Sequence, residues 1–445
     1  MASPCLTACH RVQASHSTSR HRIMTPQLFA PHSVPAHAPA RRWSGRRVAA
    51  QGATVEAVTG LDPSLTPLIE AALDDCLTET SLDLPGTHYV VGRVGERVQA
   101  GWKGPALLYE VQYPCSPFVP RLTVRSALSS SGDLSHPLIT PSAHPTPSIQ
   151  GKVRDTYDLG DRLLIVTTDR QSAFDRILAS VPFKGQVLNQ TSAWWMQATR
   201  HIVPNALLSL PDPNAALMTK CEVFPVEFVC RGFMTGSTDT SLWTHYAAGE
   251  RTYCGNTFPD GLAKNARLAQ CVITPTTKAA THDVPITPRE IVEQGLMSQA
   301  DWDTASTAAL ELFRFGQAEA AKRGLLLVDT KYEFGKDGAG TIRLVDEIHT
   351  PDSSRYWLAG SYEARHAAGQ EPENVDKEFL RLWFRGACDP YNDPVLPAAP
   401  AELVVELSRR YILLYQTITG RRFEVPEGGR PLHERLAANV AAAGL

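Results

Sequence analysis

The sequence predicts an α+β fold with antiparallel sheets and flanking helices. Apolar runs such as RLLIVTT (162–168) and EFVCRGFMT (227–235) are typical of strands. Residues 304–324 and 401–420 have the apolar spacing of helices, and each stretch ends at a glycine of the kind that closes a helix. Residues 325–357 add a third signal, because two apolar runs flank the polar turn KDGAG and so predict a hairpin.

Composition narrows the class of protein. Of the 445 residues, 43% are hydrophobic and 20% are charged, which is typical of a globular protein. The formal net charge of −3 does not indicate binding to nucleic acid or to an anionic membrane. No apolar run is long enough to predict a transmembrane helix. The nine cysteines are scattered without a C-x-x-C pair, which disfavours zinc fingers and disulfide scaffolds.

The N-terminal third differs in character from the rest of the chain. No acidic residue precedes Glu56, whereas arginines are frequent there. This composition predicts an organellar transit peptide over residues 1–50, directed to a chloroplast, with a mitochondrion as second choice; a basic tail without a targeting role is the alternative. Residues 51–86 are expected to form an N-terminal helical segment, and the Pro- and Ser-rich residues 87–148 are expected to be a flexible insertion.

Two stretches are candidates for binding phosphate. In GKVRDTYDLGDRLLIV (151–166), Lys152 and Arg154 alternate before a glycine turn, so both can point to one side of a hairpin that covers a polyphosphate. A solvated basic hairpin is the alternative. In VPFKGQVLNQTSAWW (181–195), Lys184 lies at the start of a helix-like run, where phosphate is favoured; an ordinary loop lysine is the alternative.

Two further stretches suit a phosphorylated or acidic substrate. VFPVEFVCRGFMTGST (223–238) joins an apolar strand carrying Glu227 and Arg231 to a small-residue turn with Ser237. An arginine, a hydroxyl and backbone N–H groups suit a phosphomonoester, although Glu227 and Arg231 could equally form a pair within one sheet. The polar loop at 274–290 contains Lys278 and His282, and is either a flexible substrate loop or a plain surface loop.

The charges of the predicted hairpin suggest a metal site. Alternate residues of a strand share a face, so Lys331 and Glu333 would lie on one side of the first strand together with Asp329. Pairing residue 333 with residue 346 would place Glu333 and Asp346 on one face, as oxygen ligands suited to Mg²⁺. Lys331 would neutralise charge on a transferred phosphoryl group. A ladder of surface salt bridges is the alternative.

The segment that follows, PDSSR, adds a second anion-binding set. It contains Asp352, Ser354 and Arg355 within four residues. An arginine fork beside a hydroxyl is suited to a carboxylate or a phosphate, so this segment is expected to contact an anionic substrate.

In this order, these stretches resemble the SAICAR synthetase family, phosphoribosylaminoimidazole-succinocarboxamide synthase, in its plant and algal plastid form. GKVRDTYD, FKGQVLNQTS, PVEFVCRGFMTGS, TPTTKA, LVDTKYEFG and DEIHTPDSSRYW match the family pattern between about residues 151 and 425. The resemblance implies a two-lobed, ATP-grasp- or kinase-like α+β fold, with an N-lobe at 149–235 and a C-lobe at 236–445. Residues 87–148 depart from the family pattern.

The resemblance also implies an activity. It is the ATP-dependent joining of the carboxylate of carboxyaminoimidazole ribonucleotide (CAIR) to L-aspartate, in purine biosynthesis. The implied ligands are ATP, Mg²⁺, CAIR and L-aspartate, without nucleic acid or membrane partners, in a monomer or homodimer. The ATP residues would be Lys152, Arg154, Lys184, Val223, Phe224 and Glu227. The substrate residues would be Arg231, Ser237, Lys278, His282, Asp352, Ser354 and Arg355. Glu333 and Asp346 would hold the metal, with Lys331 and Asp329 at the reacting centre.

Overall fold

The structure is a computed structural model that describes residues 63–82, 84, 149–174, 176–238, 240–278, 284–375, 378–426 and 430–445. These residues all belong to one compact unit, Ala49–Leu445. The predicted leader (1–50), the whole of the predicted insertion (87–148) and His282 lie outside the described residues. No described helix has the length and apolar character needed to cross a bilayer, and no described cysteine forms a disulfide.

The first sheet is antiparallel, with strand order β1-β2-β3-β7-β6. Gly160, at the β2–β3 turn, has φ 92°, a conformation that glycine adopts at little steric cost. Alternate residues of β3 face two different cores, because Leu164 and Val166 pack with the N-terminal segment and α10, whereas Leu163 and Ile165 pack on the α3 side. The strands are β1 (Ile149–Gln150), β2 (Arg154–Asp158), β3 (Arg162–Thr167), β6 (Leu207–Asp212) and β7 (Ala215–Thr219).

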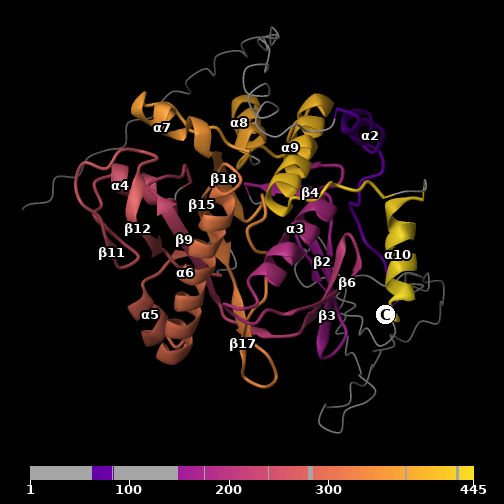
Figure 1. Ribbon diagram of the computed structural model, residues 1–445, viewed down its shortest axis with the longest axis horizontal. Helices are drawn as coiled ribbons and strands as arrows, with labels where there is room; N and C mark the ends of the chain where they lie inside the picture. Colours follow the sequence, from indigo (N-terminus) through magenta and orange to yellow (C-terminus); the bar gives the residue numbers. More distant parts are fainter. Residues whose placement is uncertain are drawn as a thin grey trace, which may run out of the picture. The chain divides into compact units, whose positions relative to one another are not determined.

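The second sheet has the order β14-β13-β9-β15-β18, and β12 pairs with β9 outside this path. Helix α6 (Gln299–Ala321) lies across one face of it (Figure 1), where Phe228 of β9 stacks on Trp302 at 5.2 Å between ring centroids. The strands are β9 (Val226–Phe233), β12 (Arg267–Ile273), β13 (Thr276–Thr277), β14 (Val284–Pro285), β15 (Leu325–Tyr332) and β18 (Ser354–Leu358).

Short strands and helices complete the fold. The remaining strands are β4 (Arg170–Ala173), β5 (Arg176–Ser180), β8 (Glu222–Val223), β10 (Thr252–Tyr253), β11 (Asn256–Thr257), β16 (Phe334–Lys336) and β17 (Ile342–Leu344). The remaining helices are α2 (Leu65–Ala71), α3 (Lys184–Ala198), α4 (Leu242–Ala247), α5 (Pro288–Glu293), α7 (Ala359–Ala367), α8 (Glu378–Ala387), α9 (Ala401–Thr419) and α10 (Leu432–Ala442). The helices predicted at 304–324 and 401–420 are confirmed as α6 and α9, and Gly420 caps α9 with φ 68°.

The predicted long hairpin is present only at its tip. Strands β16 and β17 pair with Phe334 opposite Leu344, so Glu333 faces Val345 rather than Asp346, and the predicted register is wrong. Strand β15 pairs instead with β9 on one side and β18 on the other. An apolar run such as LLLVDTKY is buried best in the interior of a sheet, with a partner strand on each edge.

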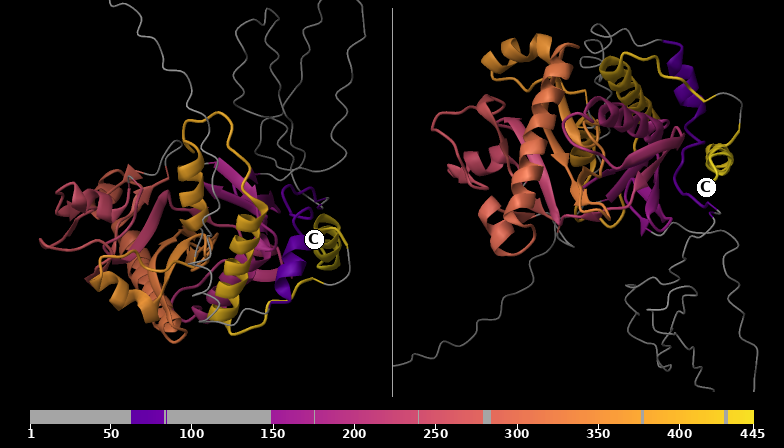
Figure 2. Two further views of the ribbon diagram at one scale, coloured as in Figure 1. Left: turned by 90° about the horizontal axis from the view of Figure 1, so that it is seen from above. Right: turned by 60° about the horizontal axis from the view of Figure 1, so that its bottom comes forward.

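The two lobes exchange elements along the sequence. Strand β9, which falls within the predicted N-lobe at 149–235, is an interior strand of the second sheet. Helices α9 and α10, from the predicted C-lobe at 236–445, return to the first sheet, where α9 packs against α3 and α10 packs against β6 (Figure 2). Each face of the first sheet needs an apolar cover; α3 and α10 contact the sheet directly, and α9 packs on α3. The domain ranges themselves stay predictions.

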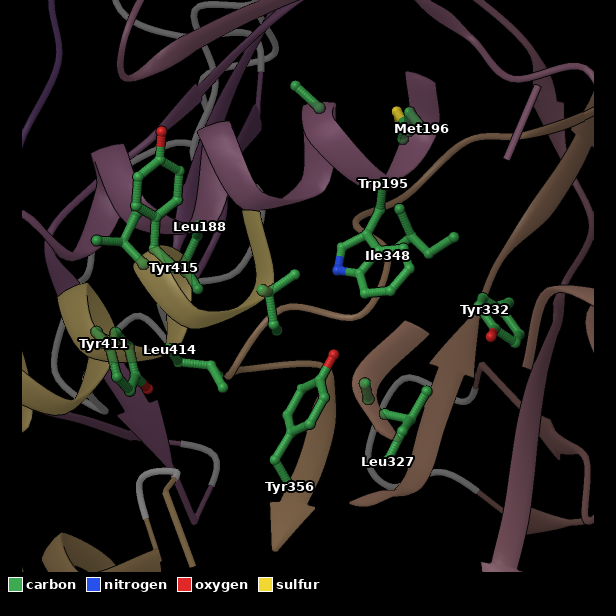
Figure 3. Packing of buried hydrophobic residues seen from close by; sticks show 14 of the residues in the cluster. Leu188, Trp195, Met196, Leu327, Tyr332, Ile348, Tyr356, Tyr411, Leu414 and Tyr415 are labelled. Carbon is green, nitrogen blue, oxygen red and sulfur yellow. The ribbon is translucent and has the colours of Figure 1, made fainter. Parts of the chain in front are cut away.

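A continuous apolar core joins the two sheets (Figure 3). Trp195 of α3, Leu327 of β15, Tyr356 of β18 and Leu414 of α9 are all buried in one cluster. Because side chains from both sheets interlock there, the charged residues on either side of the cleft are held on one packed base.

Candidate active site

Charged residues line the face of the second sheet opposite α6. The register places Arg231 of β9 beside Asp329 of β15, and Asp329 beside Arg355 of β18. Lys331 lies two residues after Asp329 and therefore on the same face, as the alternation of β15 predicted. Three adjacent strands thus present their polar side chains to a common surface.

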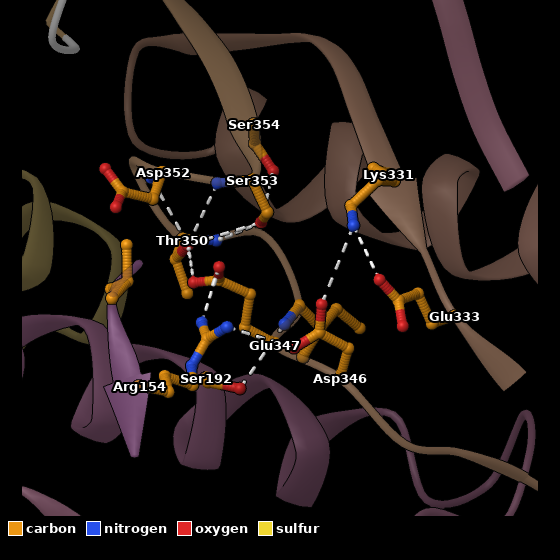
Figure 4. A network of polar contacts seen from close by, with 12 residues as sticks. Arg154, Ser192, Lys331, Glu333, Asp346, Glu347, Thr350, Asp352, Ser353 and Ser354 are labelled. Atoms are coloured by element: carbon orange, nitrogen blue, oxygen red, sulfur yellow. Dashed lines mark hydrogen bonds and ion pairs between the residues drawn. The ribbon is translucent and has the colours of Figure 1, made fainter. Parts of the chain in front are cut away.

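Lys331 is the centre of the first cluster on this surface, which we call the Lys331 cluster (Figure 4). Its Nζ atom lies 2.7 Å from Glu227 Oε1, 2.6 Å from Glu333 Oε1 and 3.8 Å from Asp346 Oδ2. Lys278 pairs with the second carboxylate oxygen of Glu333. The two predicted metal ligands therefore meet at one ammonium group, although the register that predicted their meeting was wrong.

The first sheet contributes Arg154 to the same cluster. Its guanidinium nitrogens lie 3.2 Å from Asp346 Oδ1 and 2.5 Å from Glu347 Oε1. Arg154 is the first residue of β2, whereas both carboxylates follow β17. This contact links the two sheets across the cleft. Lys152 is exposed two residues earlier.

The cluster has an excess of negative charge. Among the described residues that form it, the carboxylates of Glu227, Glu333, Asp346 and Glu347 face the cations of Arg154, Lys278 and Lys331. One carboxylate is therefore not neutralised by the protein. A further cation at this position would be favoured electrostatically.

The pKa values of the cluster show where that excess lies. Burial alone would lower the pKa of Lys331, but Asp346, Glu333 and Glu227 outweigh burial and raise it, so the ammonium stays charged. Burial would raise the pKa of Asp346, yet Arg154 and Lys331 hold it at about 2. Burial and the nearby Asp346 raise the pKa of Glu333, and the two lysines offset this only in part.

A second group of charges surrounds Asp329. Its carboxylate pairs with Arg355 and lies 3.8 Å from Arg231, whose Nε donates to Thr274 Oγ1 at 2.8 Å. Burial and the neighbouring Arg355 lower the pKa of Arg231, while Asp329 opposes them. Asp329, predicted to act at the reacting centre, is here the counter-ion between two arginines. It holds both guanidinium groups on the cleft surface.

A pocket of about 320 Å³ opens beside Arg355. Ser237, predicted from the sequence, lines it together with Arg355. The pocket also contains three cations that sequence reasoning missed, Lys264, Arg385 and Arg410. Arg385 could have been noticed, because α8 carries arginines four residues apart; Lys264 and Arg410 gave no local signal.

Two predicted residues occupy positions that differ from their expected roles. The side chain of Lys184 is fully buried and its Nζ lies 2.8 Å from Asp352 Oδ2, so it does not reach the cleft as an ATP residue would. It holds Asp352, which also accepts a 2.6 Å hydrogen bond from the Tyr411 hydroxyl. Ser354 is buried, and its hydroxyl lies 2.7 Å from Thr330 Oγ1, on the side of the sheet away from Arg355.

Val223 and Phe224, which the resemblance assigned to ATP, do not line the small space found beside Arg154. A small space of about 40 Å³ lies between the first sheet and α3, with Arg154 and Asp346 at its edge, and neither Val223 nor Phe224 lines it. Val223 is largely exposed in β8, and the Phe224 backbone N–H donates to Phe334. Apolar residues make up part of the lining of this space, namely Ile165, Leu188, Met196, Leu207, Ala216 and Met218, and Thr167, Asn189 and Ser192 add polar groups.

Comparisons with known proteins identify the family. The family model described as SAICAR synthetase matches residues 147–397. A chloroplastic phosphoribosylaminoimidazole-succinocarboxamide synthase of Arabidopsis thaliana is 64% identical over 295 residues, covering 66% of this chain and 72% of that protein. A Legionella pneumophila protein of the same name, without the chloroplastic label, is 62% identical over 291 residues, covering 65% and 93%.

A solved structure supports the same grouping. The SAICAR-synthase from Saccharomyces cerevisiae, complexed with SAICAR, is 30% identical to this chain. It superposes with a TM-score of 0.54, over 62% of this chain and 95% of that chain. Fold, motifs and cleft lead to one conclusion: the chain belongs to the SAICAR synthetase family.

Proposed function

We propose that the cleft between the two sheets carries out the ligase reaction of the family. ATP drives the joining of the CAIR carboxylate to the amine of L-aspartate, giving SAICAR, ADP and phosphate in de novo purine biosynthesis. The Lys331 cluster is the observation that carries this proposal. It combines cations that stabilise a transferred phosphoryl group with an excess carboxylate, and it adjoins a cation-lined pocket.

The cation-lined pocket would bind the ribonucleotide 5′-phosphate. Arg355 and Ser237 line it, and Arg231 shares Asp329 with Arg355 at its edge. A guanidinium fork recognises phosphate through two parallel hydrogen bonds, so a dianion could exchange places with the Asp329 contact. Arg385 would add positive charge to the same pocket, where Lys264 and Arg410 are already paired with Glu371 and Glu406.

Lys152 and Arg154 would lie over the ATP phosphates. Lys152 is exposed two residues before Arg154, and Arg154 already contacts Asp346. The small, partly apolar space beside Arg154 would accept part of a purine ring. Glu227, which the resemblance assigned to ATP, contacts Lys331, so we assign it to the orientation of that ammonium group.

The carboxylates fit a hard divalent cation. No cage of three or more His, Cys, Asp or Glu side chains occurs in the part of the chain that the structure describes. Mg²⁺ needs no such cage, because it commonly takes one or two carboxylates together with water and substrate phosphates. Glu333 and Asp346 would hold it, and it would supply charge neutralisation at the phosphates.

The chain's own residues would promote two successive bond exchanges. In the first, a CAIR carboxylate oxygen bonds to the γ-phosphorus of ATP and ADP leaves, which gives an acyl phosphate. In the second, the aspartate amine bonds to the acyl carbon, phosphate leaves, and the nitrogen loses a proton. Lys331 stays charged throughout and faces the developing negative charge, while Arg154 and Arg355 orient the two substrates.

Release of ADP by purified 51–445 tests the proposed reaction. We expect release that requires both CAIR and L-aspartate, and formation of SAICAR in equal amount. Succinate, which has both carboxylates of aspartate but no amine, is the matched control and should yield no ligated product. ADP release without SAICAR formation, or activity with succinate equal to that with aspartate, would contradict the proposal.

The subcellular location of the protein is a separate proposal. Relatives from Arabidopsis thaliana and Vigna aconitifolia, each 64% identical, are described as chloroplastic. Together with the Arg-rich, acid-free leader, this supports import into plastids and removal of roughly the first 50 residues. Import by isolated chloroplasts, followed by N-terminal sequencing, tests it. A mature chain beginning at Ala2, or import by mitochondria alone, would contradict it.

A further inference from the structure

The backbone of the segment Gly151–Arg154 is held by its carbonyl groups. Arg170 donates from Nη2 to Gly151 O at 2.9 Å and from Nε to Lys152 O at 3.4 Å. The next carbonyl, that of Val153, accepts from both the backbone N–H and the hydroxyl of Thr168, at 2.9 and 2.7 Å. Three consecutive carbonyls thus have fixed partners, while the side chain of Lys152 is left exposed.

Arg170 is itself fixed by a buried carboxylate. Its guanidinium lies 2.5 Å from Asp155 Oδ1, and both side chains are almost completely buried. Asp155 follows Arg154 directly on β2, so the two side chains point to opposite faces of the sheet. Arg154 faces the cleft and Asp155 faces the core behind it. The position of Arg154 therefore depends on the anchoring of Asp155.

A third segment, distant in sequence, completes this anchor. Arg170 Nη1 donates to Thr78 O at 2.6 Å, and the Thr80 hydroxyl donates to Asp155 Oδ2 at 2.7 Å. Leu77 is bound at both its backbone groups by Asp169, the neighbour of Arg170. Leu77, Leu82 and Leu84 also pack into the core behind the first sheet.

We propose that Arg170 is a positioning residue for the nucleotide, and that residues 77–80 are part of its support. Arg170 holds the carbonyls of Gly151 and Lys152 so that Lys152 and Arg154 lie over the ATP phosphates. The inference rests on the proposed function, since it takes this loop as the ATP loop. It adds residues that do not touch the nucleotide, and it gives the N-terminal segment a part in catalysis.

Two substitutions test the anchor with little change in volume or charge. Arg170→Lys keeps a cation for Asp155, but one ammonium cannot reach all the carbonyls that the planar fork reaches. Thr80→Val removes the hydroxyl that contacts Asp155. The matched controls are Arg162→Lys, an exposed arginine on the neighbouring strand β3, and Glu79→Gln, an exposed residue beside Thr80.

The readout is a steady-state comparison with ATP, CAIR and L-aspartate each varied in turn, with thermal melts of every variant. We expect the KM for ATP to rise about tenfold in Arg170→Lys and less in Thr80→Val, because a misplaced loop weakens contacts to ATP. The KM values for CAIR and aspartate should change by less than about twofold, and both controls should match the wild type.

Two outcomes would overturn the inference. One is a lowered melting temperature with an unchanged KM for ATP, which would mark Arg170 as a purely structural residue. The other is an equal rise in all three KM values, which would mark general damage. Equilibrium binding of ATP to each variant, without CAIR or aspartate, separates this inference from the ligase assignment. A wild type that binds ATP but makes no SAICAR would refute the assignment, and the variants would still test the anchor.

Discussion

At the scale of single residues, the site is organised by cations shared between carboxylates. Lys331 contacts Glu227, Glu333 and Asp346, and Asp329 is shared by Arg231 and Arg355. A charged side chain with several partners can give up one of them to a substrate anion or a metal and still keep another. The residue-scale predictions test which exchanges matter.

The first prediction concerns the carboxylates. Glu333→Gln and Asp346→Asn should each lower turnover by about tenfold to a hundredfold, since residues that bind or orient a metal commonly have effects of that size. Lys331 keeps Glu227 in both variants, so melting temperatures should stay within a few degrees of the wild type. Glu222→Gln, on the adjacent strand β8, is the exposed control. Near-normal turnover of both variants at saturating Mg²⁺ would contradict the site assignment.

The second prediction concerns substrate affinity. Arg355→Lys should raise the KM for CAIR with a smaller change in kcat, because a lysine ammonium cannot form the two parallel bonds of a guanidinium. Steady-state kinetics with CAIR and ATP varied separately measure this. A rise in the KM for ATP alone would place Arg355 at the nucleotide and remove it from the phosphate pocket.

The third prediction concerns pH and a buried histidine. His349 is fully buried, and burial lowers its pKa from 6.5 to about 3. Its neutral form is favoured in the fold, so its contribution to stability is present above pH 6.5 and is lost as the pH falls toward 3. Between pH 7 and pH 5 the loss should be about 2 kcal/mol.

His349→Asn isolates this effect, because asparagine tolerates the left-handed backbone at this position, φ 53°. The difference in unfolding free energy between wild type and variant, measured in urea at several pH values, cancels the other titrating groups. We expect the wild type to lose more stability than the variant from pH 7 to pH 5. Parallel curves would show that His349 takes up a proton in the folded state.

At the scale of elements, close packing of α3 on the first sheet sets the position of the cleft wall. A Cβ atom on Gly185 would lie 2.3 Å from Thr167 O and 2.5 Å from Asn214 Nδ2. Gly185→Ala should therefore destabilise the fold by about 1–3 kcal/mol, the usual cost of overpacking. Gly360→Ala in α7 is the control, since nothing lies within 4 Å of its Cβ position. Equal urea midpoints for the two variants would contradict the prediction.

Local sequence patterns predicted several helices and strands, but they did not predict which strands pair with each other. The apolar spacing and terminal glycines of α6 and α9 lie within each helix, so a short window of sequence contains them. Strand β15 pairs with β9, which lies some hundred residues earlier in the sequence, and with β18. No local sequence pattern indicates these partners. The hairpin prediction paired residue 333 with residue 346, whereas the structure places Glu333 opposite Val345, and no local pattern distinguishes two registers that differ by one residue.

At the scale of the whole molecule, the N-terminal segment belongs to the fold although it is separated from it in sequence. Leu77, Leu82 and Leu84 share a core with Tyr157 and Leu436. Excision of residues 90–145 should leave a folded and active enzyme, because these contacts are made by residues on either side of the excised stretch. Thermal melts and the ADP-release assay check this. An insoluble or inactive product would show that residues 90–145 are required.

The sequence by itself determined the family, the two long helices and the alternating charges of β15, since motifs and periodicity are local properties of the chain. Only the tertiary structure decided which charges meet. It buried Lys184 against Asp352, brought Arg154 from the first sheet to Asp346, and gathered Lys264 and Arg410 around one pocket. A buried charged side chain needs an oppositely charged or hydrogen-bonding partner nearby. Which partners lie nearby depends on the packing of segments that are far apart in sequence.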